Sequence, residues 1–330
     1  MNIKEEIIGL CKKNGISTIG FSECRIFHEL SPYFEKRKKL GLENEFEEHS
    51  IDKRINPFLY MLEGKTIISI AFPYIYDLDF SQGASFSKYT LGRDYHVVTT
   101  EYMDKICKLI QGMGGKAMRF VDSNALPERY IASNSGVGFI GKNNTLITEK
   151  YGSYVFLGEI ITDLIIEPDI PLERKCGNCN RCLEACPTNS IVEGKVGINN
   201  NPNICLSYIT QKKNIEDSWF IKLNGRLFGC DSCQRACPYN KGIQFSTISE
   251  FKPYEYMENI NLQVLVNIDN KLFKDRYKIT SCGWRGKNML KRNAIINAIS
   301  IEKGKIMTIE KDTSPYIRDY YYRLLKYFKL

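Results

Sequence analysis

The chain has 330 residues, of which 43% are hydrophobic and 25% charged, as in a folded globular protein with a substantial core. No stretch approaches the roughly 20 uninterrupted apolar residues of a membrane helix, and the opening MNIKEEIIGLCKKNG lacks a signal core, paired arginines and a cleavage site. We therefore expect a cytoplasmic protein without a membrane span. The net charge of +8 is compatible with a nucleic-acid partner but does not by itself indicate one.

The first half of the chain alternates helical and strand patterns. A helix is predicted before Gly15 by apolar residues that share one face, namely Ile3, Ile7, Leu10 and Cys11. Strands are predicted at ISTIGF, KTIISIAFPY and KAMRFVD, with an amphipathic helix between Tyr102 and Met113. The pattern predicts an α/β domain over residues 1–167, and the polar loop after KAMRFVD lies where such domains usually bind ligands.

The stretch GVGFIGKNNTLIT contains the spacing Gly-X-Gly-X-X-Gly. In a dinucleotide site this spacing leads into a helix that binds phosphate. Here Lys142, Asn143 and Asn144 lead instead into the β-like TLIT, so we predict no nicotinamide or flavin site. YGSYVFLGEIIT then predicts another strand.

From about Pro168 the composition shifts to cysteine, asparagine and proline, which predicts a separate iron–sulfur domain over residues 168–245. In a reducing compartment, clustered cysteines point to metal or redox chemistry rather than to disulfides. Cys176, Cys179, Cys182 and Cys186, followed by proline, have the spacing of a bacterial 4Fe-4S ferredoxin. Zinc is a weaker alternative, because its four ligands usually come as two well-separated pairs.

A second run, Cys230, Cys233 and Cys237 before Pro238, is one cysteine short, and Cys205 is the nearby candidate to complete it. In two-cluster ferredoxins the last cysteine of a run binds the other cluster. That rule assigns Cys176, Cys179, Cys182 and Cys237 to one cluster and Cys186, Cys205, Cys230 and Cys233 to the other. Two neighbouring clusters form a path for single electrons. The remaining cysteines, Cys11, Cys24, Cys107 and Cys282, are predicted to be small buried apolar side chains.

Residues 246–330 are predicted to form a basic helical region. Lysines and arginines are dense between Lys271 and Arg292, and NMLKRNAIINAIS has the pattern of an amphipathic helix. A last helix is predicted at SPYIRDYYYRLLKYFKL, with Ser314 as its N-cap and Pro315 at its first position.

The chain resembles the epoxyqueuosine reductase family. The resemblance covers about nine-tenths of the chain and runs through IDKRINP, SKYTLGRDYH, VDSNALPERYIASNSGVGFIGKNN, YGSYVFLGEI, both cysteine runs with CLSYITQK between them, NGRLFGCDSCQRACPYNKG and GWRGKNMLKRNA. It implies an α+β protein with an α/β cobalamin-binding domain, a ferredoxin-like domain with two 4Fe-4S clusters, and a short HEAT-like helical tail. It also implies reduction of the epoxide of epoxyqueuosine at the tRNA wobble position to an alkene.

The resemblance implies roles for several residues. Asp122 matches the family's proposed proton donor; a carboxyl group at a strand end, partly desolvated by a corrin, can have the raised pKa that a general acid needs. A turn-capping role for Asp122 is the alternative, because VDSNALPER is rich in turn formers. Arg54 and Ser87 match cofactor-binding positions of the family, although Arg54 by itself could equally be a surface charge or part of a salt bridge. Asp122, Asn143 and Asn144 are also predicted to contact the cofactor. DYHVVT lacks the glycine of the corrinoid motif, and the resemblance implies a base-off cobalamin without a protein ligand.

We expect the tRNA to contact Trp284, Arg285, Lys287 and Arg292, which combine a stacking surface with cations. A solvated helix face beside a buried tryptophan is the alternative. We further expect a monomer that receives electrons from a flavodoxin or a ferredoxin.

Three other functions stay open from the sequence. A cytoplasmic reductive dehalogenase would use the same cofactors, and a family member could act on another substrate. A non-catalytic ferredoxin-type electron carrier would differ from all of these by containing iron and sulfide without cobalt.

Overall fold

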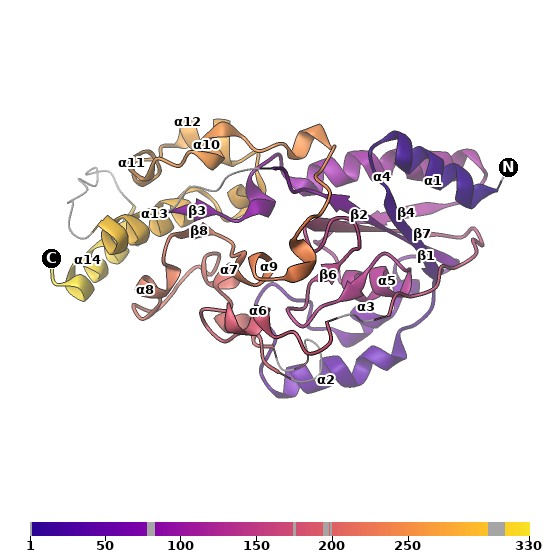
Figure 1. Ribbon diagram of the computed structural model, residues 1–330, viewed down its shortest axis with the longest axis horizontal. Helices are drawn as coiled ribbons and strands as arrows, with labels where there is room; N and C mark the ends of the chain where they lie inside the picture. Colours follow the sequence, from indigo (N-terminus) through magenta and orange to yellow (C-terminus); the bar gives the residue numbers. More distant parts are fainter. Residues whose placement is uncertain (1, 78–82, 174–175, 194–197, 199, 303–313) are drawn as a thin grey trace. The chain divides into compact units, whose positions relative to one another are not determined.

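The computed structural model describes residues 2–77, 83–173, 176–193, 198, 200–302 and 314–330 (Figure 1). The chain divides into two compact units. Unit 1 comprises Met1–Ile75, Tyr95–Pro202 and Ser232–Ser249, and unit 2 comprises Tyr76–Asp94, Asn203–Asp231 and Glu250–Leu330. Each unit thus consists of three separate stretches, whereas the sequence predicts three consecutive domains over residues 1–167, 168–245 and 246–330. That three-domain division stays a prediction.

Unit 1 is built on a four-stranded sheet with the order β1-β2-β7-β4 (Figure 1). The strands are β1 (Thr18–Glu23), β2 (Thr66–Pro73), β7 (Val155–Thr162) and β4 (Ala117–Phe120). Every neighbouring pair is antiparallel. All eight residues of β2 are buried, which explains its uninterrupted apolar sequence. The four strands lie where the sequence predicts them, but their order and antiparallel pairing are not evident from it.

Helices cover both faces of this sheet (Figure 1). On one face α4 (Tyr95–Gly112) packs against β4 and β7, and α1 (Ile3–Lys13) packs against α4. On the other face α5 (Glu128–Asn134) packs against β1, β2 and β7. This packing requires a glycine at position 20, where a Cβ atom would lie 1.8 Å from the carbonyl oxygen of Ser135. The end of α5 therefore lies directly against β1 at this position.

The rest of unit 1 is made of short elements. They are α2 (Ser31–Lys39), α3 (Ile51–Ile55), the hairpin of β5 (Phe139–Ile140) and β6 (Leu146–Ile147), α6 (Arg181–Glu184) and α9 (Ser232–Arg235). The segment after Gly141 leads into β6, as predicted, and not into a helix. Helices α6 and α9, one from each cysteine run, pack against each other.

Unit 2 has a parallel pair of short strands, β3 (Ser85–Phe86) and β8 (Arg226–Phe228), surrounded by helices. These are α7 (Leu206–Ile209), α8 (Trp219–Leu223), α10 (Glu255–Glu258), α11 (Leu262–Val266), α12 (Asn270–Leu272), α13 (Lys287–Glu302) and α14 (Pro315–Phe328). Single helical turns occur in the two units at His28–Leu30, Pro57–Leu59, Lys88–Thr90, Pro202–Ile204, Pro238–Asn240, Ser249–Phe251, Phe273–Tyr277 and Ser281–Arg285.

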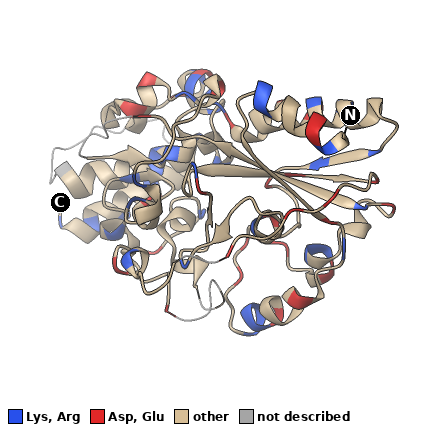
Figure 2. Ribbon diagram, turned by 45° about the vertical axis from the view of Figure 1, so that its right-hand side comes forward, with Lys and Arg blue, Asp and Glu red and all other residues tan. Residues whose placement is uncertain are grey.

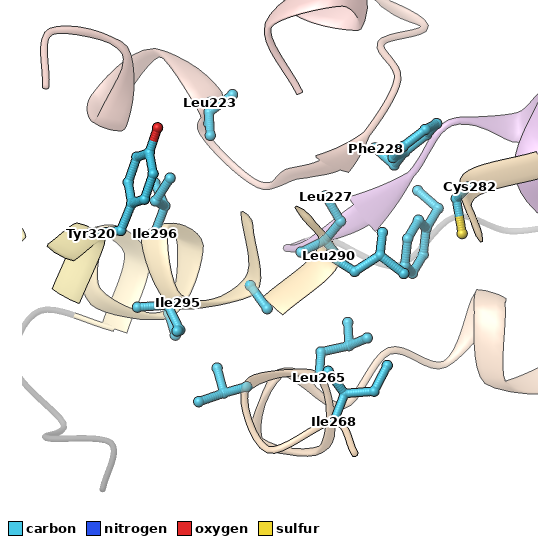
Figure 3. Close-up of a cluster of buried hydrophobic side chains, with 14 of the residues drawn as sticks. Leu223, Leu227, Phe228, Leu265, Ile268, Cys282, Leu290, Ile295, Ile296 and Tyr320 are labelled. Atoms are coloured by element: carbon cyan, nitrogen blue, oxygen red, sulfur yellow. The ribbon is translucent and has the colours of Figure 1, made fainter. Parts of the chain in front are cut away.

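The core of unit 2 surrounds α13. Figure 3 shows side chains of α13 between residues from β8 and α8 and residues from the α11 region; the labelled ones are Leu223, Leu227, Phe228, Leu265, Ile268, Cys282, Leu290, Ile295, Ile296 and Tyr320. The predicted last helix is confirmed, since Ser314 Oγ accepts a hydrogen bond from the backbone nitrogen of Ile317 at 3.4 Å. Within the described part of the chain, no helix is both long enough and apolar enough to cross a membrane.

Candidate active site and iron–sulfur ligands

Asp122 lies in the loop that leaves the carboxyl end of β4, as the sequence predicts. Its φ angle is +46°, in the left-handed region that residues other than glycine rarely adopt. Its carboxyl group accepts a hydrogen bond from Tyr95 Oη at 2.7 Å, and His96 Nε2 lies 3.2 Å from the same oxygen, Oδ2. The Asp122 side chain is 58% exposed, so its carboxyl group is open to a ligand.

Tyr95 and His96 are the first two residues of α4. The Tyr95 ring stacks on Phe156 of β7 with 4.2 Å between ring centroids, and the His96 ring stacks on Tyr95 at 4.1 Å. The stack fixes both rings against the sheet, so two groups that bind Asp122 come from a rigid helix terminus. No local pattern in the sequence identifies Tyr95 or His96 as a partner of Asp122.

The pKa of Asp122 in the chain alone reflects its hydrogen-bond partners. Desolvation acts to raise its pKa, but hydrogen bonds from His96 and Tyr95 and the charges of His96 and Arg129 outweigh it and lower the pKa of Asp122 below the ordinary value. These hydrogen-bond donors favour the carboxylate form in the chain alone. The raised pKa expected from the sequence applies to a carboxyl group that a bound corrin desolvates, and it stays a prediction.

Glu128, the first residue of α5, also belongs to this site. Its Oε1 accepts hydrogen bonds from the Asp122 backbone nitrogen at 2.7 Å and from Asn124 Nδ2 at 2.9 Å. Desolvation and the charge of Asp122 raise the pKa of Glu128 to about 7. Glu128 lies within the motif VDSNALPERY, but nothing in the sequence indicates that it binds the Asp122 backbone.

Asn143 and Asn144 lie in the turn between β5 and β6. Asn143 Nδ2 is buried and has no hydrogen-bond partner among the described residues. The carbonyl oxygen of Asn144 accepts a hydrogen bond from Arg129 Nη1 at 2.8 Å, and Arg129 also lowers the pKa of Asp122 by its charge. A buried donor without an acceptor suits a ligand rich in amide and phosphate oxygens, such as cobalamin.

Arg54, another predicted cofactor contact, is packed within unit 1. Its guanidinium lies 3.8 Å from the centroid of the Phe34 ring, and Nη1 is 3.4 Å from Glu47 Oε2. The side chain is 15% exposed. Arg54 is thus an oriented cation with little freedom, which is compatible with the predicted role.

Ser87 belongs to unit 2, where it precedes the turn Lys88–Thr90. Its hydroxyl donates a hydrogen bond to Asp231 Oδ1, and Asp231 Oδ2 accepts from the Lys88 backbone nitrogen at 2.8 Å. Ser87 is buried, and Gly229 must lack a side chain because a Cβ atom there would lie 2.4 Å from Ser87 Cβ. Its predicted contact with the cofactor stays a prediction.

The four cysteines predicted for the first cluster gather within unit 1. Cys237 packs with Phe139 and Ile147, and Cys176 lies against the same apolar group. Burial, followed by the neighbouring thiols of Cys176, Cys237 and Cys179, raises the pKa of Cys182 to about 11. Among the described residues, no group of three or more ligating side chains is placed to hold a metal ion, so the assignment of these four cysteines to one cluster stays a prediction.

Of the other four predicted ligands, Cys186 and Cys233 belong to unit 1, while Cys205 and Cys230 belong to unit 2. The Ser190 backbone nitrogen donates to Cys186 Sγ at 3.3 Å, and Arg226 Nε donates to Cys230 Sγ at 3.2 Å. The assignment of these four cysteines to one cluster stays a prediction.

The four isolated cysteines are buried, as predicted. Cys11, Cys24, Cys107 and Cys282 are all 8% exposed or less. Desolvation raises the pKa of Cys11 and Cys282 to about 12 and is the largest cause that raises the pKa of Cys24 and Cys107 to about 11. These thiols therefore remain protonated and unreactive near neutral pH.

The predicted tRNA contacts separate into two groups. Trp284 is 55% exposed, its Nε1 donates to Gln211 Oε1 at 3.0 Å, and the Arg285 guanidinium lies 4.8 Å from the centre of its ring. Lys287 is partly exposed at the start of α13. These three residues stay candidates for tRNA contact.

Arg292 is a correction to the sequence-based prediction. Its side chain is fully buried, and its guanidinium donates to the carbonyl oxygens of Lys212, Lys213, Ile209 and Thr210 as well as to Asn293 Oδ1. It cannot reach a phosphate in this conformation. The reason is that the chain before Lys213 presents several carbonyl groups that need donors.

Charge alone does not mark a nucleic-acid surface. Figure 2 shows basic and acidic residues distributed over many helices, and the last turn of α2 holds four basic residues far in sequence from Trp284. The tRNA assignment therefore depends on the exposed aromatic ring of Trp284 rather than on net charge.

Family models match two parts of the chain. Residues 54–123 match the model described as "Epoxyqueuosine reductase QueG, DUF1730", and residues 175–240 match the "4Fe-4S double cluster binding domain". The first match includes Arg54, Ser87 and Asp122, and the second includes all eight predicted cluster ligands. The described helices and sheets, together with the double-cluster match, confirm the predicted α+β fold class.

Curated relatives match almost the whole chain. The epoxyqueuosine reductase of Bacillus subtilis is 34% identical, with 96% of this chain and 85% of the relative covered. That of Listeria monocytogenes is 39% identical over 89% of this chain and 79% of the relative.

Solved structures agree with these relatives. A crystal structure of epoxyqueuosine reductase with an epoxyqueuosine-modified tRNA-Tyr stem loop has a TM-score of 0.92 at 34% identity, covering 99% of this chain and 90% of that one. A structure of the Bacillus subtilis enzyme with its catalytic aspartate loop swung out of the active site has a TM-score of 0.90 at 32% identity, with the same coverage. The double-cluster match indicates two 4Fe-4S clusters as cofactors, and the chain belongs to the epoxyqueuosine reductase family.

Proposed function

We propose that this chain reduces the epoxide of epoxyqueuosine in tRNA to the alkene of queuosine and that Asp122 is its proton donor. The observation that carries the proposal is the setting of Asp122, a left-handed residue whose exposed carboxyl group is bound by Tyr95 and His96. Such a conformation costs on the order of 1 kcal/mol and persists only where surrounding contacts impose it. It supports a functional role over the turn-capping alternative.

The reaction consumes two electrons and two protons, forms a carbon–carbon double bond and releases the epoxide oxygen as water. Bound cobalamin supplies a strongly reducing cobalt centre for the carbon–oxygen bond. Asp122 holds the proton for the leaving oxygen, and Tyr95 and His96 orient its carboxyl group. When cofactor and substrate exclude water from this carboxyl group, desolvation raises its pKa and favours the protonated form that a general acid requires.

The residues proposed to hold the cofactor are Arg54, Ser87, Asn143 and Asn144. Asn143 Nδ2 provides a buried donor, and Arg54 provides an oriented cation. For the clusters we propose Cys176, Cys179, Cys182 and Cys237 as one ligand set and Cys186, Cys205, Cys230 and Cys233 as the other. Electrons enter singly from an external flavodoxin or ferredoxin.

For the tRNA we propose contact through Trp284, Arg285 and Lys287, without Arg292. A half-exposed indole beside a guanidinium can stack an unpaired base of the anticodon loop, while Lys287 binds phosphate. A tRNA substrate also supports a location in the cytoplasm. We propose a monomer because one chain contains the proposed cobalamin-binding, iron–sulfur and tRNA-binding regions.

The relatives favour this function over the alternatives. Both curated relatives described above carry the name epoxyqueuosine reductase over more than three-quarters of their own length. Neither a dehalogenase nor a non-catalytic electron carrier explains the match of residues 54–123 to the reductase model.

The experiment is an anaerobic turnover assay with reconstituted clusters, cobalamin, a low-potential reductant and epoxyqueuosine-containing tRNA. Nucleosides are analysed by mass spectrometry for the loss of one oxygen. We expect conversion that requires cobalamin, and a loss of about 100- to 10,000-fold in kcat for Asp122→Asn.

Asp52→Asn, at an exposed position of α3, is the control and retains the activity of the unmodified chain. Full turnover by Asp122→Asn would remove Asp122 from the mechanism. No conversion by protein shown to contain both clusters and cobalamin would remove epoxyqueuosine as the substrate.

A further inference from the structure

A second acid lies beneath the Asp122 loop, in the sheet itself. Glu159 occupies the middle of β7 and is fully buried. It pairs in register with Ser69 of β2 on one side and with Phe120 of β4 on the other. Ser69 Oγ donates to Glu159 Oε1 at 3.2 Å, whereas Glu159 Oε2 is buried without a donor among the described residues. A carboxylate in this position would carry an uncompensated charge, which is costly.

The nearby carboxyl group of Glu128 changes the ionisation of Glu159. Desolvation, the charge of Glu128 and a hydrogen bond to Glu128 raise the pKa of Glu159 well above its ordinary value. Burial and the nearby Glu128 carboxyl group thus favour the protonated form of Glu159.

Glu128 also contacts the Asp122 loop. Glu128 Oε1 accepts the backbone N–H of Asp122 at 2.7 Å and the side-chain N–H of Asn124 at 2.9 Å. Asn124 N also donates to the carbonyl oxygen of Asp122 at 2.6 Å, which closes a very tight turn. The peptide group on each side of Asp122 is thereby fixed, and its φ angle of +46° follows.

A continuous series of contacts thus joins the sheet to the proposed proton donor. It runs from Glu159 in β7 to Glu128 in α5, then to the backbone of Asp122, whose carboxyl group meets Tyr95 and His96. Loops at active sites need such support, because an error of about 1 Å in the position of a catalytic group can cost about 100-fold in rate.

We propose that Glu128 is a positioning residue that holds the Asp122 backbone in the conformation presenting its carboxyl group to Tyr95, His96 and the substrate. This inference rests on the proposed role of Asp122 as proton donor. It assigns no proton transfer to substrate to either glutamate, because the contacts of Glu128 are with the loop.

The test compares Glu128→Ala, Glu128→Gln and the unmodified holoenzyme. Hydrogen exchange measured by mass spectrometry reports the Asp122 amide, and turnover is measured with an epoxyqueuosine-modified tRNA stem loop. In Glu128→Ala we expect the amide to exchange at least about tenfold faster and kcat to fall by about 10- to 100-fold, with KM for the tRNA unchanged.

Glu128→Gln separates positioning from charge. Its amide oxygen can accept the same two hydrogen bonds, so we expect slow exchange and most of kcat to return. Glu5→Ala is the matched control, because Glu5 also lies in the first turn of a helix, on the exposed surface of α1. We expect no change in exchange or in kcat for this variant.

Glu128→Asp provides a second route if Glu128→Ala does not fold. Aspartate keeps the charge and the helix position, but its side chain is one methylene shorter and its carboxyl group lies farther from the Asp122 loop. We therefore again expect faster exchange of the Asp122 amide and a lower kcat. Unchanged exchange at Asp122 in both Glu128→Ala and Glu128→Asp would overturn the inference.

The proposed function and the inference can fail separately. If Asp122→Asn is fully active while Glu128→Ala loosens the loop, the proton-donor role falls and the positioning contact stands. If Asp122→Asn is inactive and the Glu128 variants retain slow exchange and full kcat, the proton-donor role stands and the inference falls.

Discussion

Replacing Arg292 by alanine tests whether this arginine supports unit 2 or binds tRNA. The substitution removes the donors from the carbonyl oxygens of Ile209 and Lys212 and from Asn293 Oδ1. Each buried acceptor left without a partner costs about 1–3 kcal/mol. Allowing for some relaxation, we expect a loss of about 3–5 kcal/mol, which is a large fraction of a typical unfolding free energy.

The assay is thermal unfolding of the holoenzyme followed by circular dichroism, with tRNA stem-loop binding measured in parallel. A loss of this size lowers Tm by roughly 10 °C. Arg292→Lys should recover little, because a single ammonium group cannot replace the spread of donors on a guanidinium. Lys287→Ala, in the first turn of the same helix, is the control and should leave Tm nearly unchanged while weakening tRNA binding.

The reasoning would be refuted if Arg292→Ala kept its Tm and lost tRNA affinity. That result would require the arginine to leave its buried carbonyl partners at little cost. Equal losses of tRNA affinity for Arg292→Ala and Lys287→Ala, with both proteins fully folded at the assay temperature, would also contradict the assignment.

Three further outcomes follow from contacts described above. Cys237→Ser should lower the iron content from about eight to about four atoms per chain, as measured by iron analysis and electron paramagnetic resonance. Cys11→Ser is the control and should leave the iron content unchanged, because Cys11 is a buried core residue. Glu159→Gln should raise Tm at pH 8 but not at pH 5. The raised pKa of Glu159 contributes stability that is complete below the ordinary pKa of 4.5 and is lost as the pH rises through the raised pKa, and glutamine does not ionise. Equal Tm differences at both pH values would contradict this. Gly20→Ala should destabilise unit 1, since its Cβ atom would meet the Ser135 carbonyl oxygen at 1.8 Å; chemical denaturation measures the loss, and an unchanged midpoint would show that α5 can move away.

Much of the secondary structure can be predicted from the sequence. Strand β2 is buried throughout, so it is a continuous apolar run, and α14 begins with Ser314 and Pro315, which mark a helix start locally. The cysteine spacing that predicts the iron–sulfur domain is likewise contained in short stretches of sequence. These features are encoded by residues close together in the chain.

The residues that the sequence misassigns or does not reveal have roles set by contacts with residues far away in the chain. Arg292 stands in a basic, amphipathic segment, and only the fold shows that the carbonyl groups at Ile209 and Lys212 surround it. Tyr95 and His96 meet Asp122 across 27 and 26 positions, with no local pattern to indicate it. Glu159 is different, because a single acid inside the apolar run VFLGEIIT is a visible signal of a special role.

The polar residues buried on α13 have a consequence for the order of assembly. Asn293 donates to the carbonyl oxygens of Thr210 and Leu227, and Asn297 donates to that of Arg226 and accepts from the Gly225 nitrogen. These backbone groups flank Cys205 and Cys230. The ribosome adds α13 more than fifty residues after the last of them, as the sequence shows. The segment that carries two proposed iron ligands therefore gains these hydrogen bonds only after α13 has been synthesised.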